Sequence, residues 1–137
     1  MVDKVSVTIV SPEQHFLTDD VDMVVVPGSE GDIGVLPRHA AMISSLRPGI
    51  VTLYRGEEKQ HIFLSSGFVD INEKACLVLA ENCEYVTDMN FEELESYAQR
   101  LSEELQIART QAEKDELEEI RKMTLYKVEM IRKLKAH

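Results

Sequence analysis

The sequence predicts an N-terminal β-sandwich followed by a C-terminal antiparallel helical hairpin, a β + α fold in two segments. All six glycines and all four prolines lie at or before position 67, so only the first part is punctuated by turns. Apolar residues alternate with polar ones there, whereas beyond position 90 they recur three or four residues apart. We expect one domain over residues 1–87 and a second over residues 88–137.

Short strands account for the first part of the chain. Val5, Val7 and Ile9 face one way and the residues between them face the other, which indicates a half-buried strand. The expected strands are residues 4–9, 21–26, 50–54, 61–64, 68–71 and 75–80. The last four form two hairpins, around residues 55–57 and 72–74. Strands this short and closely spaced predict a sandwich or barrel.

The second part carries two helical stripes that are out of phase. Asn90 followed by Glu93 resembles a capping box, which predicts a helix start. The first stripe is Phe91, Leu94, Ala98, Leu101, Leu105 and Ala108, and the second is Leu117, Ile120, Thr124, Val128, Ile131 and Leu134. The phase change favours two helices with a bend at residues 110–115. One continuous helix of about 46 residues is the alternative, and a segment that adopts both states would act as a switch.

Composition excludes several classes of partner. The 137 residues carry a net charge of −10, which disfavours phosphate backbones and anionic lipid headgroups. No apolar run approaches the roughly 20 residues of a membrane span, so we expect no direct lipid insertion. The first residues lack the layout of a signal peptide, which predicts that the chain stays in the compartment where it is made. Cys76 and Cys83 match no zinc or redox spacing and are expected to be reduced.

A glycine repeat is the most distinctive local motif. Gly28, Gly31 and Gly34 recur every third residue, which matches neither a dinucleotide fingerprint nor a Walker loop. Glu30 and Asp32 lie within the repeat and would repel a phosphate. We interpret the repeat as a shaped loop with positive φ at several glycines, suited to a protein contact.

No set of residues indicates catalysis or a resident metal. The four histidines are isolated, and His39 is expected to be a loop histidine bonded to backbone. Glu30 and Asp32 could form an acid/base pair in a small hydrolase, but nothing in the sequence would separate their pKa values, so this hypothesis ranks last.

Charge in the second part is segregated. Carboxylates cluster at residues 113–119 and basic residues follow them, interrupted by Glu129. One interpretation is solvated helix faces with favourable basic charge at a helix C-terminus. The other is a basic face that meets an acidic partner surface.

Residues 26–49 resemble the signature of the epsilon subunit of the bacterial F-type ATP synthase. The matching positions are Gly28, Gly31, Gly34, Pro37, His39, Ala40, Leu46, Pro48 and Gly49. Residues 10–13 and 64–68 add weaker matches, and a β-rich half before a glycine-free helical half also fits. The resemblance covers nearly the whole chain.

The resemblance implies a non-catalytic central-stalk subunit of a proton-translocating ATP synthase, which couples rotation of the c-ring to ATP synthesis. Its sandwich would bind the gamma subunit and stand on the c-ring. Asp32 would face the polar loops of the ring, and Glu30 and His39 lie close enough in sequence to share that contact. The chain would be peripheral on the cytoplasmic face of the bacterial inner membrane.

The helical half would restrain ATP hydrolysis when extended. By the same resemblance, its basic residues would meet an acidic stretch of the catalytic beta subunit. The candidates are Arg121, Lys122, Lys127, Arg132 and Lys133.

Two departures from the family pattern concern specific residues. Arg38 and Ala41 replace the glycine and proline that many members carry around the histidine. Some members bind ATP through an Ile/Leu-Asp-x-x-Arg-Ala stretch, where this chain has Asn90 for the aspartate and Glu93 for the arginine. A phosphate would lose its charge partner, so we predict no nucleotide cofactor, which a thermal-shift titration with ATP tests.

Other functions remain open at this stage. A generic sandwich-and-hairpin adaptor in another complex is the main alternative. A transcript-cleavage factor of the Gre type would deliver a metal from a hairpin tip such as Asp115 and Glu116, but in that family the hairpin comes first in the chain.

Overall fold

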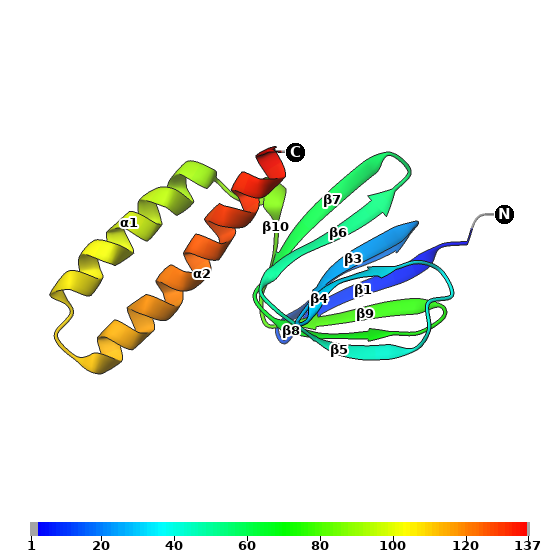
Figure 1. Ribbon diagram of the computed structural model, residues 1–137, viewed down its shortest axis with the longest axis horizontal. Coiled ribbons are helices and arrows are strands. Elements are labelled where there is room, and N and C mark those ends of the chain that lie inside the picture. Colours follow the sequence, from blue (N-terminus) through cyan, green and yellow to red (C-terminus); the bar gives the residue numbers. More distant parts are fainter. Residues whose placement is uncertain (1–2, 137) are drawn as a thin grey trace. The chain divides into compact units, whose positions relative to one another are not determined.

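The computed structural model describes residues 3–136 and divides between Val86 and Thr87 into a β unit and a helical unit. The first unit contains ten strands and the second contains two helices, and the two helices run antiparallel (Figure 1). The predicted β-sandwich followed by a helical hairpin is therefore confirmed, and a single continuous helix is not what the chain adopts.

The strands form one ten-stranded sheet that folds over into two layers (Figure 1). They are β1 (Val5–Ser11), β2 (Gln14–Val21), β3 (Met23–Gly28), β4 (Gly31–Val35), β5 (Met42–Leu46), β6 (Gly49–Arg55), β7 (Glu58–Leu64), β8 (Gly67–Ile71), β9 (Ala75–Ala80) and β10 (Cys83–Tyr85). Their order is β10-β7-β6-β3-β5-β8-β9-β1-β2, and β4 pairs only with β3. The β3–β5 step rests on one register pair, Gly28 opposite Leu46, which is where the sheet passes between layers.

The sandwich core is built by alternation along the strands. Val5, Val7 and Ile9 of β1 are at most 1% exposed, while Ser6 and Thr8 between them stay half-exposed. Each buried aliphatic side chain contributes about 1.5–3 kcal/mol relative to an exposed one. The period of two in the sequence therefore predicted the correct face of this strand.

Several strand predictions need correction. The apolar run 21–26 is not one strand, because β2 ends at Val21 and β3 begins at Met23. Asp22 stands between them and accepts hydrogen bonds from Lys4 and from the backbone N–H of Gly56 (2.6 Å). Both predicted hairpins are present, as β6–β7 and β8–β9. Strands β2, β4, β5 and β10 were missed because they are short or carry polar residues on their exposed faces.

The glycine repeat is not a free loop. Gly28 closes β3, Gly31 opens β4 and Gly34 lies inside β4, so the repeat forms a hairpin with Ser29 and Glu30 at its turn. Positive φ occurs at Gly31 (143°) but at neither of the other two, so the expectation of several such positions was wrong. At Gly28 the requirement is space, because a Cβ would lie 2.5 Å from the carbonyl oxygen of Gly31.

The helical unit contains α1 (Phe91–Ile107) and α2 (Gln111–Ala136). The predicted cap is confirmed, because the Asn90 side chain accepts from the backbone N–H of Glu93 at 3.1 Å. The predicted bend lies too late, since the chain already turns at residues 108–110. Thr110 Oγ1 accepts from the N–H of Glu113 (3.1 Å), and the Glu113 carboxylate accepts from the N–H of Arg109 (3.2 Å), which starts α2 at Gln111.

Few side chains are buried in the helical unit. The buried ones lie on the two predicted stripes and are Ala98, Leu101, Thr124, Val128 and Ile131. Arg121 Nε donates to Ser102 Oγ across the hairpin at 2.9 Å, and Arg132 pairs with Glu95 at 3.5 Å. The two helices are thus held together by a narrow apolar seam and by polar contacts of Arg121 and Arg132 across the hairpin.

Candidate interaction surfaces

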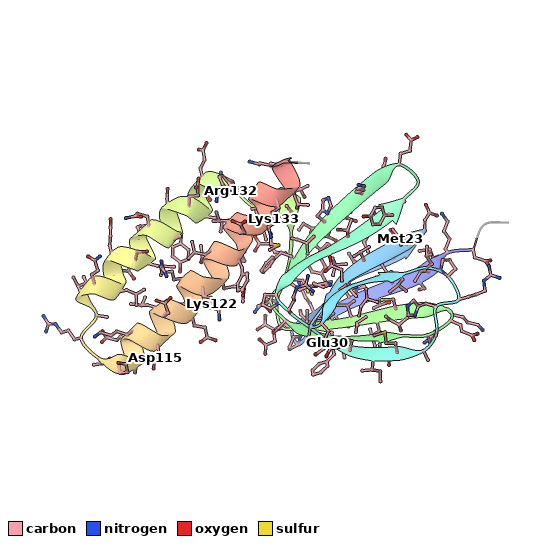
Figure 2. All side chains as sticks on the ribbon, viewed as in Figure 1. Met23, Glu30, Asp115, Lys122, Arg132 and Lys133 are labelled. Carbon is pink, nitrogen blue, oxygen red and sulfur yellow. The ribbon has the colours of Figure 1, made fainter. Side chains whose placement is uncertain are left out.

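An acidic turn projects from the β3–β4 hairpin (Figure 2). Glu30 is exposed at its tip, and Asp32 is exposed on β4 two residues later. Arg47 braces this turn: it forms an ion pair with Asp32 (2.6 Å) and donates to the carbonyl of Gly28. Because both charged groups are largely exposed, the ion pair contributes little net stability, and its main effect is to hold the turn in one shape.

Backbone contacts fix the same turn to β5 and to the β5–β6 connection. Ser29 N–H donates to the carbonyl of Ser45, and Arg47 N–H donates to the carbonyl of Pro27, each at 3.0 Å. The hydroxyl of Ser45 also donates to that of Ser29 at 2.8 Å. Glu30 is therefore presented from a rigid frame, so a partner would bind it without first ordering a loop.

His39 lies away from this turn, in the β4–β5 connection. Its Nδ1 is 2.7 Å from the carbonyl oxygen of Ala40, which confirms the predicted backbone-bonded loop histidine. The neighbouring Arg38 N–H donates to the carbonyl of Glu73 in the β8–β9 turn, at the opposite end of β4 from Glu30. Proximity in sequence does not bring His39 to the surface that Glu30 and Asp32 share.

An apolar face covers the outer side of β5, β8 and β9. Phe68 and Leu79 are cross-strand partners and are 58% and 47% exposed, and Ile43 on β5 is 74% exposed. Val69 and Val78, which alternate with Phe68 and Leu79, are fully buried. The outer side of these strands thus exposes large apolar side chains beside the polar Asp70 and Ser45, and exposed apolar groups of this size are typical of a protein contact.

The apolar face continues into an open hollow of about 630 Å³. Phe68, Leu79 and Val10 contribute apolar walls, and Pro12 and Glu81 from neighbouring turns form part of its lining. A hollow beside protruding aromatic and aliphatic side chains is the relief that a complementary protein surface fills.

The candidate basic residues of α2, of which Figure 2 labels Lys122, Arg132 and Lys133, differ in their contacts. Arg121 and Arg132 are engaged within the hairpin, with Glu118 (3.1 Å), Ser102 and Glu95 as partners. Lys122 and Lys133 are exposed and form no ion pair with another described residue. The five candidate basic residues are thus not one uniform patch in the hairpin.

The family model for the beta-sandwich domain of the ATP synthase delta/epsilon chain matches residues 4–86. The chain belongs to the ATP synthase epsilon-chain family. An epsilon chain of Rhodospirillum rubrum is 37% identical over 117 residues, which cover 85% of this chain and 87% of the relative. An epsilon chain of Rhodospirillum centenum is 35% identical over 137 residues, 96% of this chain and 94% of the relative.

Chains in solved structures of two mitochondrial ATP synthases have a similar fold. A chain of the Euglena gracilis mitochondrial ATP synthase, from a structure that includes the c-ring, aligns with a TM-score of 0.76 at 19% identity. The alignment covers 96% of this chain and 81% of that one. A chain from the central stalk and c-ring of the Tetrahymena thermophila enzyme aligns with a TM-score of 0.56 at 14% identity, covering 96% of both. At these identities the likeness concerns the fold alone.

Arg47 is the member of the epsilon-family signature region that sequence reasoning missed. It occupies the variable position between Leu46 and Pro48, so the motif itself gave it no weight. Only the register of β3 with β4 and β5 reveals that its guanidinium reaches Asp32. The sequence offered one weak indication of this contact, namely a single arginine in the turn that follows the acidic glycine repeat.

Other candidate chemistry is weak in the described part of the chain. Residues 3–136 contain no group of three His, Cys, Asp or Glu arranged to hold a metal ion. No helix among them is long and apolar enough to cross a membrane. Burial raises the pKa of the Cys76 thiol to about 12 and raises that of Cys83 as well, so both thiols are poor nucleophiles at neutral pH.

Proposed function

We propose that this chain is a non-catalytic central-stalk subunit that couples c-ring rotation to ATP synthesis and restrains ATP hydrolysis through its helices. Its place is on the cytoplasmic face of a bacterial inner membrane, held by protein contacts. Family membership and the described surfaces support this proposal. A generic adaptor role is disfavoured by the match over 96% of the chain to an epsilon-family relative.

The apolar face is the observation that carries the proposal. Ile43, Phe68 and Leu79 expose large apolar side chains on the outer side of β5, β8 and β9, and the hollow beside them would accept an apolar or aromatic side chain of a partner. We assign this face to the gamma subunit, because the shaft is the stalk component that must hold the sandwich firmly during rotation. Burial of these three side chains would supply an anchor of the kind that dominates stable interfaces.

The acidic turn is the candidate ring contact. Glu30 and Asp32 present carboxylates at one end of the sandwich, on a turn braced by Arg47. A rigid polar contact suits a surface that transmits torque, since a flexible loop would yield before it passed force. His39, at the other end of β4, is assigned no share in that contact.

The helical hairpin is the candidate brake. Arg121 and Arg132 stabilise the folded hairpin through Ser102 and Glu95, and they would be released if it opened. Together with Lys122, Lys127 and Lys133 they would then form the basic face that meets an acidic stretch of the beta subunit. The same two arginines would contact Ser102 and Glu95 in the folded hairpin and the beta subunit in the open one. Folding of the hairpin would therefore compete with its binding to the beta subunit.

The test is a titration of steady-state ATP hydrolysis by a matching catalytic head stripped of this subunit. The full chain should inhibit saturably, whereas a full-length Lys122→Glu/Lys133→Glu variant should bind the head equally well and inhibit less. A Phe68→Asp variant should lose affinity for the head. If Phe68→Asp still binds the head tightly, the apolar face does not bind the gamma subunit. If the lysine variant inhibits as strongly as the wild type, the basic face is not required for inhibition.

Nucleotide binding by the hairpin is not part of the proposed function. Asn90 uses its side chain to cap α1, and Glu92 and Glu93 follow it in the first turn. The groove between the helices also balances its cations Arg121, Lys122 and Arg132 with three glutamates. We expect ATP to leave the thermal unfolding midpoint unchanged, and a saturable rise of several degrees would contradict this.

A further inference from the structure

One exposed face of α2 carries its charges in an order that is complementary to its own reverse. This face lies beside the buried positions Thr124 and Val128, and its residues recur three or four positions apart, as neighbours on one side of a helix do. We call it the charged face of α2. Its eight members, all exposed, are Glu118, Glu119, Lys122, Leu125, Tyr126, Glu129, Arg132 and Lys133.

The centre of the charged face is uncovered. Leu125 and Tyr126 lie there and are 40% and 38% exposed, although both are large and mainly apolar. Lys122 on one side of them forms no ion pair with another described residue, and Glu129 on the other side forms only an exposed pair with Arg132 of its own helix, at 3.6 Å. An open groove of about 650 Å³ borders this face. The centre is therefore accessible to a second molecule.

Two antiparallel copies of α2 bring complementary residues together along the whole charged face. With Leu125 of one copy opposite Tyr126 of the other, Lys122 faces Glu129 of the second copy. The reason is that three residues back from Leu125 on one helix match three residues forward from Tyr126 on the other. The same register sets Glu119 opposite Arg132 and Glu118 opposite Lys133. A two-fold axis repeats each of these pairs, so no like charges on this face meet.

We propose that two copies of this chain associate antiparallel through the charged faces of α2. Leu125 and Tyr126 form the apolar centre of the contact, and the facing charges set its orientation, as they do between paired helices elsewhere. A parallel pair is disfavoured, because it would set Lys122 against its own copy. The net charge of −10 on each chain opposes association, but charges more than about 8 Å apart are largely screened at physiological ionic strength, whereas the facing pairs are in contact.

This association would have a consequence for inhibition. The contact uses Lys122, Arg132 and Lys133, which the proposed function assigns to the beta subunit and which Figure 2 labels along α2. A chain paired in this way would not present these cations to a catalytic head, so the unassembled subunit would be held in a non-inhibiting form. Only this consequence rests on the proposed function. The pairing itself follows from the residues of α2 and is tested without the head.

Charge reversal tests the central pair of the contact. The mass of the full-length free chain is followed by analytical ultracentrifugation over a series of concentrations, and the wild type should form a dimer. Lys122→Glu and Glu129→Lys each set like charges face to face at two points, so each should weaken association by about tenfold, equivalent to about 1.4 kcal/mol. The double variant restores opposite charges and should associate as the wild type. Arg100→Glu changes the net charge as Lys122→Glu does, but it lies on α1 and should have no effect.

Introduced cysteines test the orientation. Leu125 lies beside the two-fold axis, so Leu125→Cys should give a disulfide-linked dimer under mild oxidation. Glu118 lies on the same face, but in the antiparallel pair its two copies are separated by about 22 Å along the helices at 1.5 Å per residue, so Glu118→Cys should not. The native thiols react slowly in both variants, because burial raises the pKa of Cys76 to about 12 and also raises that of Cys83.

Each contrary result overturns a stated part of the proposal. A wild-type chain that stays monomeric at every concentration would exclude the association, and the proposed function would be unaffected. A dimer that neither single reversal weakens would place the contact on another surface. Failure of the double variant to recover would refute the pairing of Lys122 with Glu129. Disulfide formation by both cysteine variants would show a parallel pair and exclude the antiparallel register.

Discussion

The β-sandwich and the helical hairpin are stabilised in different ways. The sandwich buries a continuous cluster of apolar side chains drawn from the nine strands β1 to β9, and its turns are fixed by backbone contacts such as Arg47 to Pro27. Among the described residues of the hairpin only five side chains are buried, one of them Thr124. Elsewhere it relies on exposed pairs such as Arg132 with Glu95, which contribute about 0.2–1 kcal/mol each.

This difference assigns a mechanical role to each region. Local opening requires little free energy where few apolar contacts are buried, and switching elements are drawn from such regions. The sandwich is suited to transmit force without deforming, whereas the hairpin is suited to change state. Substitutions that force atoms into closely packed parts of the sandwich should therefore unfold it globally, and substitutions in the hairpin should loosen that region alone.

Gly67→Ala should produce the largest effect. A Cβ at this position would lie 1.8 Å from the carbonyl oxygen of Leu79, so β8 and β9 would have to separate. We expect a loss of about 3 kcal/mol or more in the free energy of unfolding, measured by urea denaturation. Gly34→Ala is the matched control, because an added Cβ there would meet no atom within 4 Å, and it should change stability by less than about 1 kcal/mol. Equal effects of the two alanines would contradict the packing role of Gly67.

Leu101→Ala should have the next largest effect, confined to the hairpin. Leu101 is 2% exposed in α1, and truncating a buried leucine costs about 2–5 kcal/mol. Amides of residues 91–136 should lose protection from hydrogen exchange, while those of β1 and β9 keep theirs. Ile107→Ala, at a 77% exposed position of the same helix, should leave both patterns unchanged. Loss of protection in the strands would show that the two regions unfold as one.

Thr110→Ala should shift the hairpin towards a continuous helix. The Thr110 hydroxyl caps α2 only when the chain bends, and alanine favours helix at that position. We expect a loss of about 1 kcal/mol of preference for the bent state, measured as the distance between spin labels on α1 and α2. Asn90→Ala removes the cap of α1 at similar cost but should leave the label distance unchanged. An unaltered distance in Thr110→Ala would mean that packing alone sets the bend.

Sequence patterns located what depends on local periodicity and missed what depends on register. The stripes containing Leu101 and Val128 identified the buried seam, and the alternation of β1 identified the core face. The bend was placed too late because the stripes stop before it, although Thr110 and Glu113 already formed the Thr-x-x-Glu spacing of a helix cap.

At the candidate surfaces, contacts between residues far apart in the sequence limited what could be predicted. Glu30 and Asp32 were found because they lie within a visible glycine motif. The contact of Arg47 with Asp32 depends on the pairing of three strands, so local sequence could not establish it. For the same reason, nine residues of separation between Glu30 and His39 suggested a shared surface, although a strand between them carries them apart. The exposure of Phe68 could not be predicted because an apolar residue at that position of a short strand fits a buried face equally well.

The smallest expected effect concerns the pH dependence of the sandwich, through His61. Partial burial, with a lesser contribution from Lys59, lowers the pKa of this imidazole, whose Nδ1 lies 3.1 Å from the hydroxyl of Thr52. The unfolded chain therefore binds more protons than the folded one as pH falls below about 6.5, so the free energy of unfolding should decrease through that range. His61→Asn should flatten the decrease between pH 7 and 5 relative to wild type, as followed by urea denaturation. Identical pH slopes for the two proteins would show that the protonated form of His61 is equally favourable in the folded and unfolded chain. The stability of the sandwich would then not depend on the titration of His61 near neutral pH.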